Sequence, residues 1–174
     1  MKISELVNKN LVEVNLKSRT KESLILEIVD CLYRNKNIKD KKAILEDLLG
    51  REKRGSTGIG EGIAIPHARI SGLKEVVLFV GLSRRGIDFS SLDGKPVYLI
   101  VLFLTPLLES ELHLKILSKV AQLLNNKVFV KRMLECSSND ELNRILKQDG
   151  IEKENFLRVL SPSLPKKEGN LSKT

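Results

Sequence analysis

Two uninterrupted apolar runs, residues 76–82 and 97–104, constrain the fold of this chain more than any other feature. Both consist almost entirely of aliphatic and aromatic residues, and both have the length of a strand. A strand that is apolar on both faces must be covered on both faces, usually by helices above and below its sheet. The two runs are therefore predicted to form the centre of a sheet between helical layers.

Helices are predicted before and after these runs, because apolar residues recur there at a spacing of three and four. Thr20, Asp40 and Ser110 stand where three of the helices begin, and their side chains can act as N-caps. Shorter strands are expected near residues 11–16 and 63–65. This alternation predicts an α/β protein with three layers and a mostly parallel or mixed sheet. The expected helices cover residues 21–35, 41 to about 53, the segment that follows the Ser110 cap and ends at Leu124, and 128–134, with a last helix after Ser138.

The composition excludes several classes of protein. The formal net charge of +8 is spread along the whole sequence, and aromatic residues make up only 4% of it. A nucleic-acid-binding domain normally gathers Lys and Arg on one face and adds aromatic residues, so no nucleic-acid partner is expected. Cys31 and Cys136 belong to no Cys-x-x-Cys pair, so neither a disulfide scaffold nor a zinc ribbon is expected.

The 174 residues are expected to form one domain, over residues 1–148, followed by an additional segment, 149–174. This segment is predicted to be partly disordered, because it is polar and contains Pro162 and Pro165. A weaker hypothesis is that this basic tail recruits an acidic partner. The first ten residues lack the apolar core of a secretion signal, and no apolar run is long enough to cross a bilayer. The sequence thus predicts a cytoplasmic protein without direct membrane insertion.

Residues 55–69 contain four glycines that lead through a short apolar run to His67. Glycines let backbone N–H groups approach an anion closely, so this stretch predicts a phosphate-binding loop. The glycine spacing does not fit a dinucleotide fingerprint, and the Gly-Lys-Ser/Thr end of a P-loop is missing. The alternative that the glycines only make an irregular connection stays open. The residues expected to contact phosphate are Ser56, Thr57, Gly58 and Gly60.

His67 adds a nucleophile to this loop. A neutral imidazole attacks phosphorus readily and can carry a phosphoryl group. Such chemistry needs cationic and hydrogen-bonding partners, for which Arg51, His113, Ser56 and Thr57 are the candidates. Spacing alone favours a simpler alternative, in which His113 lies on a helix surface and Arg51 is a solvated charge. Neither histidine has a His or Cys partner at ligand spacing, so no metal site is expected.

These residues resemble the type-2 enzyme IIA domains of the bacterial phosphoenolpyruvate-dependent phosphotransferase system, in its fructose, mannitol and nitrogen-regulatory branch. The resemblance lies in REK-x-GSTGIGEGIAIPHA at 51–68, ID-x-x-x-LDG-x-PV at 87–97 and HLKIL at 113–117. It extends from the N-terminal MKISELV to the region of Leu142. It implies a mixed sheet of about five strands between helices.

By position in these motifs, the resemblance implies that His67 is the phosphoryl acceptor, on its tele nitrogen. It implies that the donor is the small histidine phosphocarrier protein. His113 matches the second active-site histidine, and Arg51 matches the motif arginine that stabilises the phosphoryl charge. The chain is thus expected to be a phosphotransferase component with a phosphohistidine intermediate, needing neither a cofactor nor a metal.

Two functions are compatible with this resemblance. A transport component would pass its phosphoryl group to enzyme IIB of a fructose- or mannitol-type sugar permease. A regulator would use the phosphorylation state to change the charge of a face that binds a target protein. The sequence carries neither a membrane span nor a second cysteine-bearing domain, which favours a nitrogen-regulatory enzyme IIA. The sugar-specific subunit is the alternative.

Overall fold

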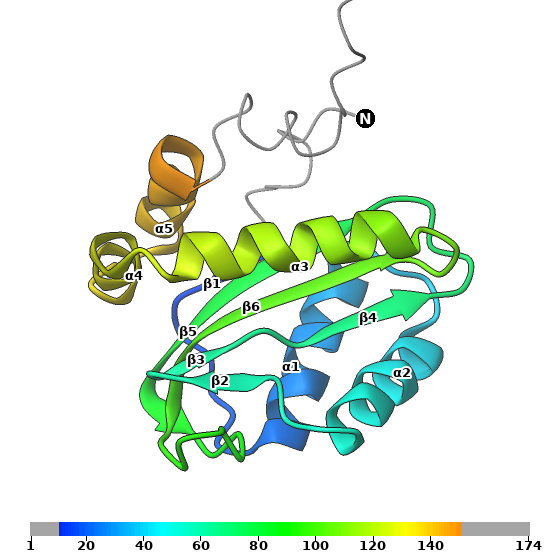
Figure 1. Cartoon of the computed structure of the whole chain (residues 1–174), viewed down its shortest axis with the longest axis horizontal. Helices are drawn as coiled ribbons and strands as arrows, with labels where there is room; N and C mark the ends of the chain where they lie inside the picture. The colour runs from blue at the N-terminus through cyan, green and yellow to red at the C-terminus, as the bar shows by residue number, and fades with distance from the viewer. Residues whose placement is uncertain (1–10, 151–174) are drawn as a thin grey trace, which may run out of the picture.

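The structure, a computed structural model, describes residues 11–150 and the side chains of residues 11–148. Helices cover both faces of a mixed sheet (Figure 1), which confirms the predicted α/β class. The sheet has six strands, in the order β1-β5-β6-β3-β2, with β4 also pairing with β6. It exceeds the expected five because two short segments of the glycine and histidine region also pair as strands. The strands are β1 (Val12–Glu13), β2 (Gly58–Gly60), β3 (Ile63–Ala64), β4 (His67–Ile70), β5 (Val77–Ile87) and β6 (Val97–Pro106).

The two apolar runs form the central antiparallel pair, β5 and β6, in which Val80 lies opposite Val101. Strand β5 continues to Ile87, five residues beyond the predicted end. A register shift between Leu82 and Ile87 accommodates the polar residues in between, and Gly86 there has a φ of 81°. The sequence prediction ended the strand at Leu82, because polar residues and Gly86 interrupt the apolar pattern after it. The chain instead pairs with β6 on both sides of this interruption.

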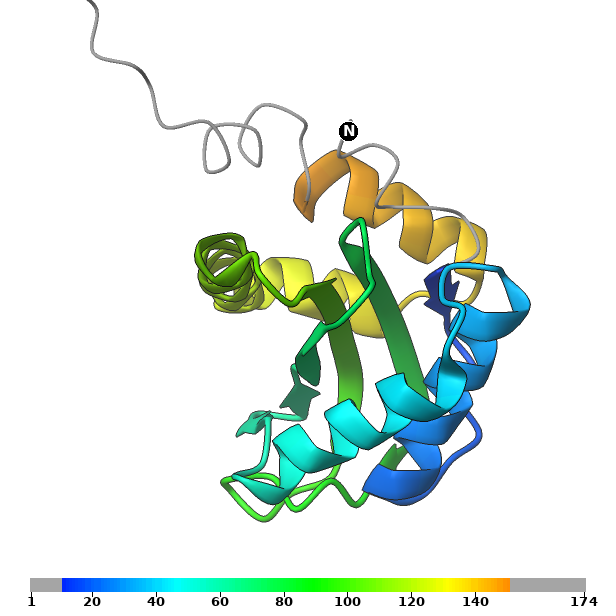
Figure 2. The same cartoon turned by 90° about the vertical axis from the view of Figure 1, so that its right-hand side faces the viewer.

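Two helices cover one face of the sheet, and three helices cover the other (Figure 2). The predicted caps of the first two are confirmed: Thr20 accepts a hydrogen bond from the Ser23 N–H, and Asp40 accepts one from the Ala43 N–H. The first face carries α1 (Lys21–Arg34) and α2 (Lys41–Lys53). The second carries α3 (Ser110–Leu124), α4 (Lys127–Leu134) and α5 (Asn139–Ile145), which runs into a π-helical turn, Leu146–Gly150.

The predicted cap of α3 is wrong. The helix begins at Ser110 itself, and its N-cap position is held by Glu109, whose side chain makes no capping hydrogen bond. The Ser110 hydroxyl instead accepts a hydrogen bond from Arg69 Nη1 at 2.6 Å. The Ser110 hydroxyl oxygen was predicted to accept from a backbone N–H of α3. It accepts instead from an arginine of β4.

Strands β3 and β4 occupy successive positions along the same edge of β6. Ile63 pairs with Leu99 and His67 pairs with Phe103, both in parallel register. Between the two strands the chain passes through Pro66, which has no N–H to donate and whose carbonyl accepts from the Phe103 N–H. After this interruption, His67 is the first residue of β4 that pairs with β6.

Two further expectations concern the C-terminal segment and membrane insertion. The additional C-terminal segment, 149–174, and the tail hypothesis lie almost entirely outside the described residues. Within residues 11–150, no helix combines the length and the apolar character needed to span a bilayer.

We expect Gly58→Ala to lower the free energy of unfolding by about 1–3 kcal/mol, because an added Cβ would lie 2.9 Å from the Ser91 Cα. The matched control is Gly50→Ala in α2, where nothing lies within 4 Å of the added Cβ. That helix substitution should stabilise the protein by up to about 1 kcal/mol. Urea unfolding of both variants tests the contact. Equal effects of the two substitutions would contradict it.

Candidate functional site

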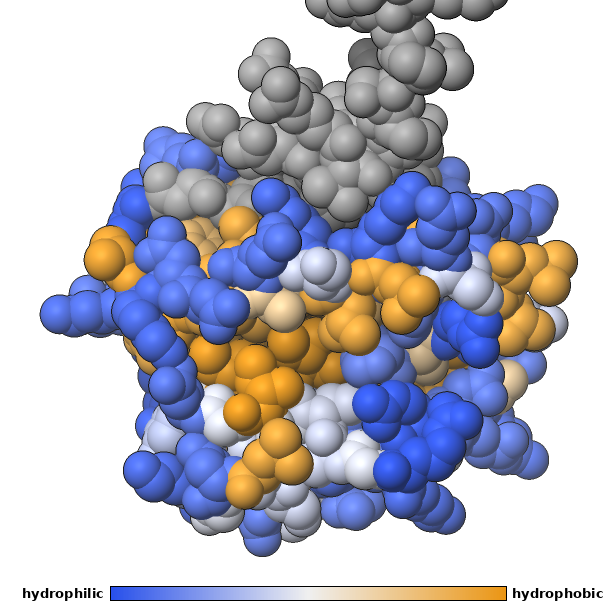
Figure 3. Space-filling model, in the orientation of Figure 1, coloured by the Kyte–Doolittle hydropathy of each residue, from blue (hydrophilic) through white to orange (hydrophobic). Residues whose placement is uncertain are grey.

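A cavity of about 520 Å³ opens at the edge of the sheet formed by β4, between α2 and α3. Figure 1 shows β4 between these two helices. In the space-filling view of the same face, strongly hydrophilic residues gather over α2 and β4, next to an apolar area that follows α3 (Figure 3). The lining consists of Asp47, Arg51, Arg54, His67, Ala68, Arg69, Leu107, Ser110, His113 and Leu114.

His67 is held in one orientation by its own loop and by β6. Its Nδ1 lies 2.7 Å from the carbonyl oxygen of Ile65, which can only accept, so Nδ1 carries the proton. The ring stacks on Phe103 with centroids 5.2 Å apart and an angle of 8° between the planes. The residue is only 8% exposed, yet it lines the cavity. The nitrogen left with a lone pair is therefore Nε2.

Burial lowers the pKa of His67 below its ordinary value, and the positive charge of Arg51 lowers it further. The hydrogen bond to Ile65 acts in the opposite direction but does not reverse the shift. The ring is therefore neutral near pH 7. A neutral imidazole with a free Nε2 is the form that attacks an electrophile such as phosphorus.

His113, in the first turn of α3, lies beside His67 with ring centroids 5.3 Å apart. Its Nδ1 is 2.7 Å from the hydroxyl oxygen of Thr105, a fully buried residue of β6. The pKa of His113 is lowered to about 4, mainly by burial and in addition by the positive charges of Arg69 and Arg51 and by that of His67 when its ring is protonated. The second histidine is therefore neutral as well. Sequence spacing alone favoured a surface position for it, whereas the fold brings it to the same cavity as His67.

Arg51 also lies at this cavity, in the last turn of α2, where its Nη1 donates to the Gly55 carbonyl at 2.9 Å. The three residues singled out from the sequence as catalytic thus share one cavity. Two further arginines line it, Arg54 and Arg69, and neither was predicted from the sequence as a site residue. A signal for Arg69 was present, because residues two apart in a strand lie on the same face. His67 and Arg69 are such a pair in β4.

The four residues expected to contact phosphate are placed elsewhere. None of them lines the cavity, and their polar groups are bonded within the fold. The Gly58 N–H donates to Ser56 Oγ, and the Gly60 N–H donates to Ser91 Oγ. Thr57 donates through both its N–H and its hydroxyl to Glu52. In the structure, Ser56, Thr57, Gly58 and Gly60 thus have a structural role in strand β2 and its flanks, and their contact with phosphate stays a prediction.

A buried ion pair joins the start of α1 to the end of α2, and both of its members also hydrogen-bond the glycine segment. Glu52 lies 3.0 Å from Lys21 Nζ, and both side chains are largely buried. Lys21 also lies over the ring of Phe89 and donates to Ser56 Oγ at 3.4 Å. Removing one member would leave the other charge buried without its partner. The network thus fixes the last turn of α2, which carries Arg51.

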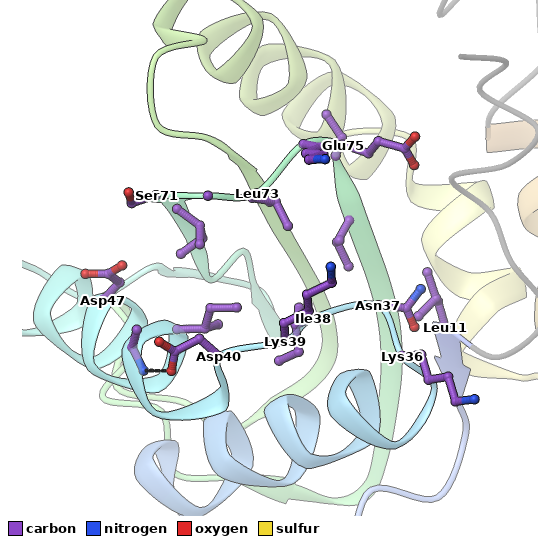
Figure 4. A pocket seen from close by; sticks show the side chains of 17 residues that line it. Leu11, Lys36, Asn37, Ile38, Lys39, Asp40, Asp47, Ser71, Leu73 and Glu75 are labelled. Atoms are coloured by element: carbon purple, nitrogen blue, oxygen red, sulfur yellow. Dashed lines mark hydrogen bonds between the residues drawn. The ribbon is translucent and has the colours of Figure 1, made fainter.

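A larger cavity, of about 650 Å³, lies between the loop that precedes α2 and the turn between β4 and β5 (Figure 4). Its lining combines aliphatic residues with lysines and carboxylates. Its lining within the described residues includes Asp47, which it shares with the first cavity, but neither histidine nor arginine. It therefore lacks the imidazole and guanidinium groups that the first cavity brings together. In the same part of the chain, no cluster of three or more His, Cys, Asp or Glu residues could hold a metal ion.

Comparison with known proteins gives one family. Residues 5–149 match the family described as "Phosphoenolpyruvate-dependent sugar phosphotransferase system, EIIA 2". The chain is 38% identical over 148 residues to the PTS system fructose-specific EIIABC component of Bacillus subtilis, covering 85% of this chain and 23% of that protein. It is 35% identical over 133 residues to the nitrogen regulatory protein of Pseudomonas aeruginosa, covering 76% and 86% of the two chains.

Solved structures agree with this assignment. The nitrogen regulatory protein IIA-Ntr of Neisseria meningitidis superposes with a TM-score of 0.76 at 33% identity, covering 83% of this chain and 99% of that one. IIA mannitol of Escherichia coli superposes with a TM-score of 0.67 at 20% identity, covering 80% and 98%, which supports the fold alone. The chain belongs to the EIIA type-2 family of the phosphotransferase system, whose members are phosphotransferase components with phosphohistidine intermediates.

We expect acid to destabilise the fold as the pH falls from about 6.5 toward 4. The unfolded chain protonates its histidines near pH 6.5, whereas in the fold the pKa of His113 is about 4 and that of His67 is also lowered. Between these values the unfolded state binds more protons, so the free energy of unfolding decreases with falling pH. Urea unfolding near pH 7 and near pH 5 measures this change, and His113→Ala should lose part of it.

The imidazole proton signals of His113, followed by NMR, should titrate with a midpoint near 4. A midpoint at or above the ordinary histidine value would contradict the burial argument.

Proposed function

We propose that His67 accepts a phosphoryl group on Nε2 from the histidine phosphocarrier protein and holds it until a second partner takes it. The observation that supports this most is the hydrogen bond from Nδ1 to the Ile65 carbonyl, which leaves Nε2 as the nucleophilic nitrogen of a neutral ring. The family supports the same chemistry. The cytoplasmic location expected from the sequence belongs to this proposal.

In the transfer step, a bond forms between phosphorus and His67 Nε2 while the P–N bond of the donor's phosphohistidine breaks. The electron pair of the broken bond returns to the donor nitrogen, and His67 keeps its Nδ1 proton throughout. No proton has to leave the attacking nitrogen, so the step needs no general base. Transfer to the next partner is the same exchange in the opposite direction.

The transferred phosphoryl group spreads negative charge over three oxygens. Arg51 from α2 and Arg69 from β4 line the cavity with His67 and supply guanidinium groups for these oxygens. Asp47 on the same lining carries the opposite charge and disfavours a bound anion. A carrier benefits from this balance, because it must release the group as readily as it binds it.

The partners would dock on the rim of this cavity. Leu107, Leu108 and Leu114 are exposed there, with Leu108 93% exposed, and Leu107 and Leu114 line the cavity itself. Exposed leucines beside arginines give a small mixed surface that suits a transient complex. A homologous fold is known in a complex of enzyme IIA mannitol with phosphorylated enzyme IIB from Escherichia coli. We propose enzyme IIB or a regulated target protein as the second partner.

Between the two branches of the family, we propose the nitrogen-regulatory type. The IIA-Ntr structure has both the higher TM-score and the higher identity of the two structures described above. Several nitrogen regulatory proteins are similar along most of their length, including that of Escherichia coli, of which the match covers 90%. The alternative is a sugar-specific subunit, supported by the fructose-specific EIIA component of Haloferax volcanii at 32% identity over 94% of that protein.

Incubation with phosphoenolpyruvate, enzyme I and the phosphocarrier protein should add one acid-labile phosphoryl group to the wild type, measured as intact mass. His67→Ala should remain unlabelled, because it lacks the acceptor nitrogen. Arg51→Ala should be labelled about 10²–10³-fold more slowly, by analogy with the loss of one preorganised charge-stabilising group.

The matched control is Arg85→Ala, which removes an exposed arginine of β5 that does not line the cavity. It should be labelled at the rate of the wild type. Labelling that persists in His67→Ala and disappears in His113→Ala would reverse the assignment of the acceptor.

A further inference from the structure

We propose that Thr105 is a positioning residue for the transfer reaction. Its hydroxyl donates a hydrogen bond to Nδ1 of His113 and thereby keeps the proton of that ring on Nε2. From that nitrogen His113 donates a hydrogen bond to the phosphoryl group on His67. This inference rests on the proposed function of His67, but the protonation of His113 can be measured without any phosphoryl transfer.

The register of β4 and β6 places Thr105 beneath the site. His67 pairs with Phe103 and Arg69 pairs with Thr105 in the parallel ladder. Because residues two apart in a strand share a face, Phe103 and Thr105 lie on the same face of β6. Phe103 stacks on His67, and Thr105 contacts His113. One strand therefore orients both histidines through neighbouring positions on one face.

The direction of the Thr105 hydrogen bond follows from burial. Thr105 is 0% exposed, and its hydroxyl makes no other hydrogen bond within the described residues. If His113 donated to Thr105, the hydroxyl proton would have no acceptor, and a buried donor without a partner is costly. If Thr105 donates instead, its proton is satisfied, and an oxygen with an unused lone pair is tolerated better. The geometry therefore favours Thr105 as the donor.

The tautomer matters because both rings are neutral. A neutral imidazole carries one proton, so each ring has one donor and one acceptor nitrogen. His67 is protonated on Nδ1 by its contact with Ile65, whereas His113 would be protonated on Nε2 by its contact with Thr105. The two rings thus have opposite tautomers. One presents a nucleophilic Nε2 and the other a donor Nε2–H.

Phe103 keeps the two imidazoles in a fixed relation. Its ring centroid lies 5.2 Å from that of His67 and 5.2 Å from that of His113. The three rings therefore contact one another in pairs. Neither Phe103 nor Thr105 is part of the cavity lining, so Thr105 acts through His113 and does not touch the phosphoryl group itself.

Two-bond ¹H–¹⁵N spectra of the full chain near pH 7 read the tautomers directly. We expect His113 in the Nε2–H form and His67 in the Nδ1–H form. The variant Thr105→Val keeps the branched shape but removes the hydroxyl, and it should shift His113 away from the pure Nε2–H form. The conservative variant Thr105→Ser should retain the wild-type pattern.

The kinetic test compares Thr105→Val in two backgrounds. In the wild type it should slow labelling of His67 by about tenfold or more, as expected for loss of a group that orients an active-site histidine. In a His113→Ala background it should change the rate little, because no imidazole is left to orient. Thr105→Ser should restore most of the rate.

Three outcomes would overturn the inference: an Nδ1–H form of His113 in the wild type, an unchanged tautomer in Thr105→Val, or equal slowing by Thr105→Val in both backgrounds. Should Thr105→Val fail to fold, the wild-type and Thr105→Ser spectra still decide it. Failure of wild-type His67 to take up a phosphoryl group would contradict the proposed function, a result distinct from each of these.

Discussion

The arrangement of the site depends on one hydrogen bond, between Nδ1 of His67 and the carbonyl of Ile65. It fixes the tautomer of the ring and determines which nitrogen can attack. The bond forms because the chain passes through Pro66 at the interruption between β3 and β4, so that the carbonyl two residues back lies beside the imidazole. A backbone acceptor is well suited to this role, because it cannot titrate and keeps its position while partners come and go.

Strand β6 provides the other half of the arrangement. Its first half pairs with β3 and its second half pairs with β4, and this second half contacts both histidines. The cationic groups come from different elements, with Arg51 on α2 and Arg69 on β4. Burial lowers the pKa of each imidazole, so both stay neutral where a charged ring would be a poor nucleophile. The fold thus buries the two imidazoles, which keeps them neutral, and places the positively charged arginines in the lining of the open cavity.

The sequence predicted the layers, because the apolar runs of β5 and β6 and the helical spacing around them reflect burial that local patterns record. It predicted His67 as well, since the glycine and proline residues before it mark an unusual backbone. It could not predict that Ser110 would bond Arg69, or that the glycine segment would pair as β2, because both depend on contacts between distant segments. Thr105 could not be identified for the same reason: it directly follows the apolar run 97–104, and the role proposed for it depends on the register of β4 and β6.

The most direct test is to determine which imidazole nitrogen carries the phosphoryl group. In ¹⁵N-labelled protein phosphorylated through the carrier protein, coupling between ³¹P and ¹⁵N identifies the bonded nitrogen. The account requires a single phosphorus coupled to Nε2 of His67, with the proton still on Nδ1. Coupling to Nδ1 of His67, or to either nitrogen of His113, would contradict it, because the bond to Ile65 would then not direct the chemistry.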